Sequence, residues 1–149
     1  MERWRSVWRD GFAPSLRTPA LNTLRDALRH DDPRLHQGST TLPPAQTSFA
    51  DYPCEGACAI GFCGWQQGLA SVGEVDEFFS RACWEADSRL GESTACRWFL
   101  NWFDDMPRSV MRRDLLAEVE LALALRQPPT EVRQARPPVP RVKARLPVA

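Results

Sequence analysis

The chain has 149 residues, of which 43% are hydrophobic and 26% charged, with 8 glycines and 13 prolines. This composition is close to that of an average soluble domain, and it excludes collagen, coiled coils and wholesale disorder. The 19 basic and 19 acidic residues cancel, but residues 51–105 hold ten acidic residues against three Arg, whereas residues 106–149 hold eight Arg and one Lys against four acidic residues.

The first part of the chain predicts one clear helix. Thr18 followed by Pro19 is typical of a helix start, because a hydroxyl can cap the first N–H groups and proline lacks only an N–H that is unpaired there. Leucines spaced three and four residues apart then form an apolar face, and the Asp-Asp-Pro sequence at 31–33 ends the helix. Before it, Trp4, Val7 and Trp8 are spaced to share one side of a short helix.

Residues 34–53 contain several Pro, Ser and Thr and few periodic apolar residues, which predicts a long extended connection wrapped on the surface. Pro53 is then expected to begin a helix that runs to about Trp65, where glycines end it. No β-strand is expected.

The second half of the chain predicts three helices. Ser71 and Glu74 form a capping box that opens the first, and Gly91 closes it. Residues 95–103 are apolar on almost every side, so we expect them to form a central helix surrounded by protein. The third helix is expected to start at Asp104 or Asp105 and to run to about residue 126.

From residue 127 onward the chain has six Pro, four Arg and one Lys against one acidic residue, and no aromatic residue. Such a segment cannot bury enough apolar surface to fold. We therefore predict an all-α protein with a compact bundle of four to five helices in a single domain, residues 1–126, followed by a flexible, basic Pro/Arg-rich tail, residues 127–149.

The composition also indicates the cellular compartment of the protein. There is no run of about 18 consecutive apolar residues, and the charged residues at the N-terminus are not followed by the apolar core of a secretory signal. Five cysteines, an odd number, fit a reducing compartment better than a disulfide framework. We therefore expect a cytoplasmic protein that does not contact membranes.

Three of these cysteines lie close together and are weak candidates for a zinc site with two upstream histidines. The five residues are Cys54, Cys58, Cys63, His30 and His36. Structural zinc sites usually combine a close cysteine pair from a turn with a second close pair elsewhere, and this spacing meets that pattern only marginally. Free cysteines are also among the most buried residues, so we favour core packing and expect neither metal nor cofactor.

Signals for catalysis are weak. The sequence has no Gly-x-Ser-x-Gly elbow, Gly-rich phosphate loop or His-Glu-x-x-His pair. Cys63 as a nucleophile would need a neighbouring base, which the local sequence does not supply. The carboxylate pairs Asp31-Asp32 and Asp104-Asp105 lie at predicted helix boundaries, where capping explains them. We therefore expect a protein that is not an enzyme.

A basic cluster, Arg108, Arg112 and Arg113, is predicted in the first turns of a helix, where cations oppose the helix macrodipole. With the exposed helix N–H groups it could bind a phosphate, a nucleic-acid backbone or an acidic patch of a partner. Neutralisation by Asp104, Asp105 and Asp114 is the alternative.

A second basic element lies in the predicted tail: Arg133, Arg136, Arg141, Lys143 and Arg145. Its proline spacing suits an extended strand in an aromatic groove or along a phosphate backbone. A merely solubilising role is the alternative.

Six tryptophans are difficult to bury completely in a chain of this length. Trp84 departs from the apolar face of its predicted helix, and Trp4 and Trp8 lie near a terminus. We expect these three to reach a partner.

The run of residues 95–104, Ala-Cys-Arg-Trp-Phe-Leu-Asn-Trp-Phe-Asp, continues into Met-Pro-Arg at 106–108 and Met-Arg-Arg at 111–113. Together with Asp-Asp-Pro-Arg-Leu at 31–35 and Cys-Gly-Trp at 63–65, it resembles a family of small, uncharacterised bacterial helical proteins. The resemblance covers roughly residues 10–126. It implies a bacterial domain and carries over no activity, cofactor or site residue.

These observations favour a non-enzymatic accessory or adaptor subunit that binds a larger protein partner or a protein–nucleic-acid complex. One alternative is a small helical nucleic-acid-binding subunit that contacts the phosphate backbone. The other is a zinc-binding or thiol-dependent small enzyme. Salt separates the first two, because phosphate binding weakens steeply with salt and an aromatic protein interface weakens much less.

Overall fold

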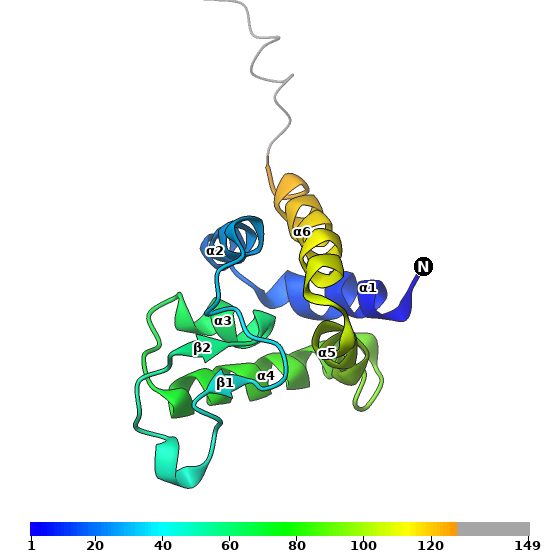
Figure 1. The fold of residues 1–149 in the computed structure, drawn as a ribbon. Helices are drawn as coiled ribbons and strands as arrows, with labels where there is room; N and C mark the ends of the chain where they lie inside the picture. The colour runs from blue at the N-terminus through cyan, green and yellow to red at the C-terminus, as the bar shows by residue number, and fades with distance from the viewer. Residues whose placement is uncertain (128–149) are drawn as a thin grey trace, which may run out of the picture.

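The computed structural model describes residues 1–127, and within them the chain is mostly helical, as predicted (Figure 1). The predicted tail, with Arg133, Arg136, Arg141, Lys143 and Arg145, lies outside the described residues. Six α-helices and one short pair of strands are present in this part of the chain: α1 (Arg3–Val7), α2 (Thr18–His30), β1 (Thr41–Leu42), β2 (Gly56–Ala57), α3 (Ala59–Trp65), α4 (Val72–Leu90), α5 (Cys96–Asp105) and α6 (Arg108–Ala124). None of these helices combines the length and the hydrophobicity that a membrane span needs.

The N-terminal segment lies across the bundle and contacts α4, α5 and α6 (Figure 1). After α1 the chain continues through a π-helical turn, Trp8–Phe12, and a 3-10 turn, Ala13–Ser15. Gly11 allows the close approach to α4, because a Cβ at this position would lie 3.1 Å from the side chains of Ala86 and Leu90. The segment therefore belongs to the core, although it is terminal in sequence.

α2 begins at Thr18 with Pro19 in its first turn, close to the predicted start, but Arg17 holds the N-cap position and no side chain caps the helix, so the prediction that the Thr18 hydroxyl does so is wrong. It ends at Asp31, whose φ of 50° reverses the chain before Pro33. Its apolar face packs against α3 and α6, and its last carbonyl groups accept hydrogen bonds from an arginine of α6.

The connection after α2 contains β1, one strand of a short β-pair, although no β-strand was expected from the sequence. β1 pairs antiparallel with β2, with Thr41 opposite Ala57. Four N–H groups of residues 54–58 donate to carbonyls of neighbouring segments: Cys54 to Ala70, Glu55 to Leu42, Ala57 to Arg34 and Cys58 to Thr40. These residues are therefore extended, and the prediction that a helix begins at Pro53 is wrong.

α4 begins and ends where its sequence signals lie. Ser71 and Glu74 form the capping box, and Gly91 closes the helix with a φ of 65°. α5, in contrast, is not surrounded by protein, because its face with Arg97, Trp98 and Asn101 is exposed. The prediction of a central helix at 95–103 is wrong. The helix is amphipathic and covers one side of the core.

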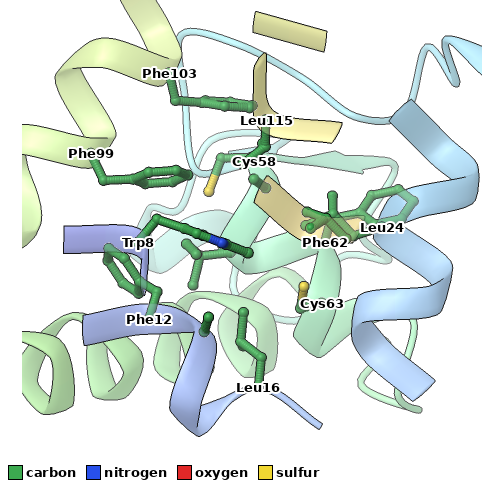
Figure 2. Close-up of a cluster of buried hydrophobic side chains, with 14 of the residues drawn as sticks. Trp8, Phe12, Leu16, Leu24, Cys58, Phe62, Cys63, Phe99, Phe103 and Leu115 are labelled. Atoms are coloured by element: carbon green, nitrogen blue, oxygen red, sulfur yellow. The ribbon is translucent and has the colours of Figure 1, made fainter. Parts of the chain in front are cut away.

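Phe99 of α5 lies in the middle of the aromatic core (Figure 2). The centroid of its ring lies 5.3 to 6.4 Å from the rings of Trp4, Trp8, Phe12, Trp102 and Phe103. The other half of the core holds Phe62 and Cys63 of α3, Leu24 of α2 and Leu115 of α6 (Figure 2). Aromatic side chains from the N-terminal segment and from α5, far apart in the sequence, thus build one core.

α6 starts at Arg108, directly after Pro107, and not at Asp104 or Asp105, which belong to α5. Its buried Glu118 accepts hydrogen bonds from Arg5 at 2.7 Å and from Arg9 at 2.7 and 2.8 Å. These contacts join the two ends of the described chain.

Candidate functional site

A surface groove of about 600 Å³ lies between α4 and α5 and is closed at one end by residues 38–40. Its floor is apolar, because Cys58 and Phe103 are buried there and Phe79, Cys83 and Leu100 are half-buried. Its rim is polar and holds Ser39, Ser80, Asp87, Arg97, Asn101 and Asp104. We call this hollow the α4–α5 groove.

Trp84 lines this groove from α4, and its side chain is 69% exposed. The exposure follows from its place on the helix, because Val75, Ala82 and Ala86 turn the opposite face of α4 into the core. A large apolar ring exposed to water beside the apolar floor of a groove is typical of a binding surface. The prediction that Trp84 is accessible to a partner is consistent with this position.

Asp87 links the two helices that form the groove. Its carboxylate accepts hydrogen bonds from the backbone N–H groups of Cys96 at 2.8 Å and of Thr94 at 3.2 Å. α5 has no side-chain cap of its own at Ala95, so Asp87 supplies that cap from α4. Asp87 therefore positions the groove, although it also lines it.

The far end of the groove is held by the loop before β1. The amide of Gln37 donates to the carbonyls of Phe103 at 2.8 Å and Met106 at 2.9 Å, and the N–H of Gly38 donates to Asp104 Oδ1 at 2.9 Å. Asp104 is exposed and lies at the C-terminal end of α5, where the helix dipole adds further negative potential. This end of the groove is electronegative.

The thiols of the groove are poor nucleophiles. Burial raises the pKa of Cys58 to about 12, and burial is also the main cause of the raised pKa values of Cys83 and Cys96. Reactive cysteines need the opposite shift, because the thiolate is the attacking species. Burial likewise raises the pKa of Cys63, the residue considered as a nucleophile, which lies at the interface of α3 and α2.

The candidate zinc residues do not come together. The thiol of Cys58 caps α3 by accepting from the N–H of Gly61 at 3.4 Å, and that of Cys54 donates to the carbonyl of Gly56 at 3.2 Å. His30 lies at the exposed end of α2, where its Nδ1 is 2.8 Å from the carbonyl of Asp26. Neither these nor Cys63 and His36 form a cluster: residues 1–127 contain no group of three or more His, Cys, Asp or Glu side chains arranged for a metal ion.

Trp4 and Trp8 do not reach the surface, so the prediction that they bind a partner is wrong. Their exposed fractions are 4% and 0%. The apolar face of α5 must be covered, and the N-terminal segment provides that cover. Trp98 is instead 53% exposed, with the guanidinium of Arg3 above its ring, 5.4 Å from the centroid. The charged and polar neighbours Arg97 and Asn101 on the same face were the sequence signal for this exposure.

Two members of the predicted anion site are used inside the fold. Arg108 donates to Asp31 Oδ1 at 2.6 Å and to the carbonyl of Asp32 at 3.0 Å, and this contact is the main cause of the lowered pKa of Asp31. Arg112 donates to the carbonyls of Leu28 at 2.9 Å and Arg29 at 3.2 Å. Both arginines thus stabilise the C-terminal end of α2. The prediction that they form a free anion site is therefore wrong.

Arg113 pairs with Asp114 at 2.9 Å, one of the three carboxylates considered as neutralising partners. Asp104 and Asp105 form no ion pair with the three arginines of the basic cluster. The partner of Arg108 is Asp31, seventy-seven positions earlier in the sequence, and this pairing was not predicted. The sequence carries no local signal for a pairing over that distance.

Comparison of the chain with protein families, with curated proteins and with solved structures gives no match.

Proposed function

We propose that the chain is a non-enzymatic accessory or adaptor subunit that binds a larger protein partner through the α4–α5 groove. The observation that carries the proposal is the exposed indole of Trp84 beside a groove of about 600 Å³ whose floor is apolar and whose rim is polar. Tryptophan is among the residues that contribute most to binding energy when a partner covers it. An apolar centre with a polar rim is also the ordinary anatomy of a protein interface.

The chemistry of the groove favours binding over catalysis. The raised pKa values of its thiols disfavour thiolates at neutral pH. Both oxygens of Asp87 accept hydrogen bonds from backbone N–H groups, so this carboxylate is occupied by helix capping. A general acid or base would need a side chain whose proton can reach a substrate.

A nucleic-acid-binding subunit is less well supported by the described residues. Arg108 and Arg112 each direct two guanidinium donors to carbonyls or a carboxylate of the same chain, so fewer donors remain for a phosphate. The groove itself has an electronegative end at Asp104, which repels a phosphate backbone.

The test is capture of partners by the tagged full chain from its native cells, after nuclease treatment and at moderate salt. Trp84→Ala is compared with Trp98→Ala, which removes an exposed tryptophan outside the groove. The proposal expects proteins that the wild type and Trp98→Ala retain and Trp84→Ala loses. Partners that both variants retain would contradict the groove as the docking surface, and loss of all bound material after nuclease would favour the nucleic-acid alternative.

A further inference from the structure

We infer that the α4–α5 groove takes an arginine side chain of an extended, basic segment in the partner protein, with its guanidinium at Asp104 and its methylene stem on the apolar floor beside Trp84. The inference rests on the proposed function and names the chemistry of the partner. It follows from the charge, the floor and the rim of the groove.

The charge comes from Asp104. Of its two carboxylate oxygens, Oδ1 accepts the N–H of Gly38, while Oδ2 accepts no hydrogen bond from the described residues. No arginine, lysine or histidine within residues 1–127 lies at ion-pair distance from this carboxylate. Among the described residues, the only cation on the rim is Arg97, seven positions earlier on α5 and therefore about 10 Å away along the helix axis. An incoming cation is favoured at the Asp104 end.

The floor suits a long side chain with an apolar stem. Phe79 and Leu100 are half-buried, so their exposed parts offer aromatic and hydrocarbon surface at the base of the groove. Arginine covers such surface with its methylene groups while its charged head stays at the polar rim. The exposed ring of Trp84 adds a face against which the stem or the guanidinium can stack.

The rim favours arginine over lysine. The planar guanidinium presents several donors in a fixed fork that matches a carboxylate, whereas an ammonium is a strongly hydrated point charge. Asn101, exposed on the same rim, can offer its side-chain carbonyl as a second acceptor. Lysine can satisfy the charge but not this geometry.

The experiment uses the purified full chain and three capped pentapeptides, Ala-Pro-X-Pro-Ala, in which X is arginine, lysine or leucine. Binding is followed by the emission of Trp84, obtained as the difference between the wild type and Trp84→Phe. The arginine peptide is expected to bind most tightly and the leucine peptide least. Asp104→Asn should weaken the arginine peptide by about tenfold, as loss of a charge-assisted pair does, while Asp105→Asn, which removes the adjacent exposed carboxylate outside the groove, should leave its affinity unchanged.

Equal binding of the arginine and leucine peptides, or equal losses in Asp104→Asn and Asp105→Asn, would overturn the inference. If Trp84 in the chain alone already emits as a buried indole and becomes exposed at high salt, the groove is filled by another part of the same chain, and the inference also falls. The proposed function is judged separately, by the partners that Trp84→Ala loses. If Trp84→Ala loses those partners but the peptides bind independently of their charge, the docking function is supported and the inferred arginine ligand is rejected.

Discussion

Trp4 lies flat against Trp102, with 3.5 Å between the ring centroids and 6° between the ring planes. The two residues come from α1 and α5, ninety-eight positions apart in the sequence. Their stack joins the N-terminal segment to the helix that forms one wall of the α4–α5 groove. The aromatic core therefore supports the α5 wall of the groove, while the loop before β1 holds its far end.

Trp102→Ala is expected to reduce the free energy of unfolding by about 3–5 kcal/mol, because it removes a buried ring and leaves a cavity against Trp4. Trp98→Ala, on the exposed face of the same helix, should cost less than about 1 kcal/mol. Chemical denaturation of both variants checks this. Equal losses would show that the two faces of α5 are assigned incorrectly.

The buried carboxylate of Glu118 should make stability depend on pH. Its hydrogen bonds from Arg9 are the main cause of its lowered pKa, and those from Arg5 lower it further. Because the folded pKa lies below the unfolded value of about 4.3, the stabilisation is complete above that value and is lost as the pH falls through the folded pKa.

Glu118→Gln is the matched change, since it keeps the shape and removes the charge. We expect it to cost about 2 kcal/mol at neutral pH, the scale of hydrogen bonds to charged groups. The stability difference from the wild type should shrink in acid, as thermal denaturation across that range would show. A difference that does not vary with pH would mean that the charge of Glu118 does not stabilise the fold.

Gly64 of α3 is expected to tolerate no side chain. A Cβ at this position would lie 2.5 Å from the ring of Phe78 on α4, so one of the helices would have to shift. Gly64→Ala should cost about 1–3 kcal/mol, the usual range for overpacking. Phe78→Leu in the same chain should recover part of the loss, which a double-mutant cycle measures. If Gly64→Ala is neutral, α3 and α4 are farther apart than described.

The thiols should react slowly in the folded protein. Burial is the main cause of the raised pKa of all five cysteines, with that of Cys58 near 12. At neutral pH, a colorimetric thiol reagent should therefore label the native chain far more slowly than the unfolded chain. Rapid labelling of Cys58 or Cys63 in the native state would contradict their burial. It would also support the alternative that the protein is a thiol-dependent enzyme.

The elements that could be predicted are those with local signals. α2 and α4 carry a start signal, a periodic apolar face and a stop within their own sequence, so their ends lie within a residue or two of the predicted ones. The exposure of Trp84 followed from the same reasoning, because it lies off the apolar face of α4.

The features that could not be predicted depend on segments distant in sequence. The pairing of Thr41 with Ala57 decides that α3 begins at Ala59, and nothing near Pro53 indicates it. Trp4 and Trp8 are buried because α5 needs cover, and Arg108 is engaged because α2 ends beside it. The groove itself exists because Asp87 caps α5 from α4, a contact made only once both helices are packed.

The most direct test of the docking surface is the set of indole N–H signals of the isotope-labelled full chain, recorded with and without a captured partner protein. We expect the signal of Trp84 to shift or broaden on binding, while the signal of Trp98, the other exposed tryptophan, stays in place. A partner that moves the Trp98 signal and leaves that of Trp84 unchanged would contradict the α4–α5 groove as the binding site.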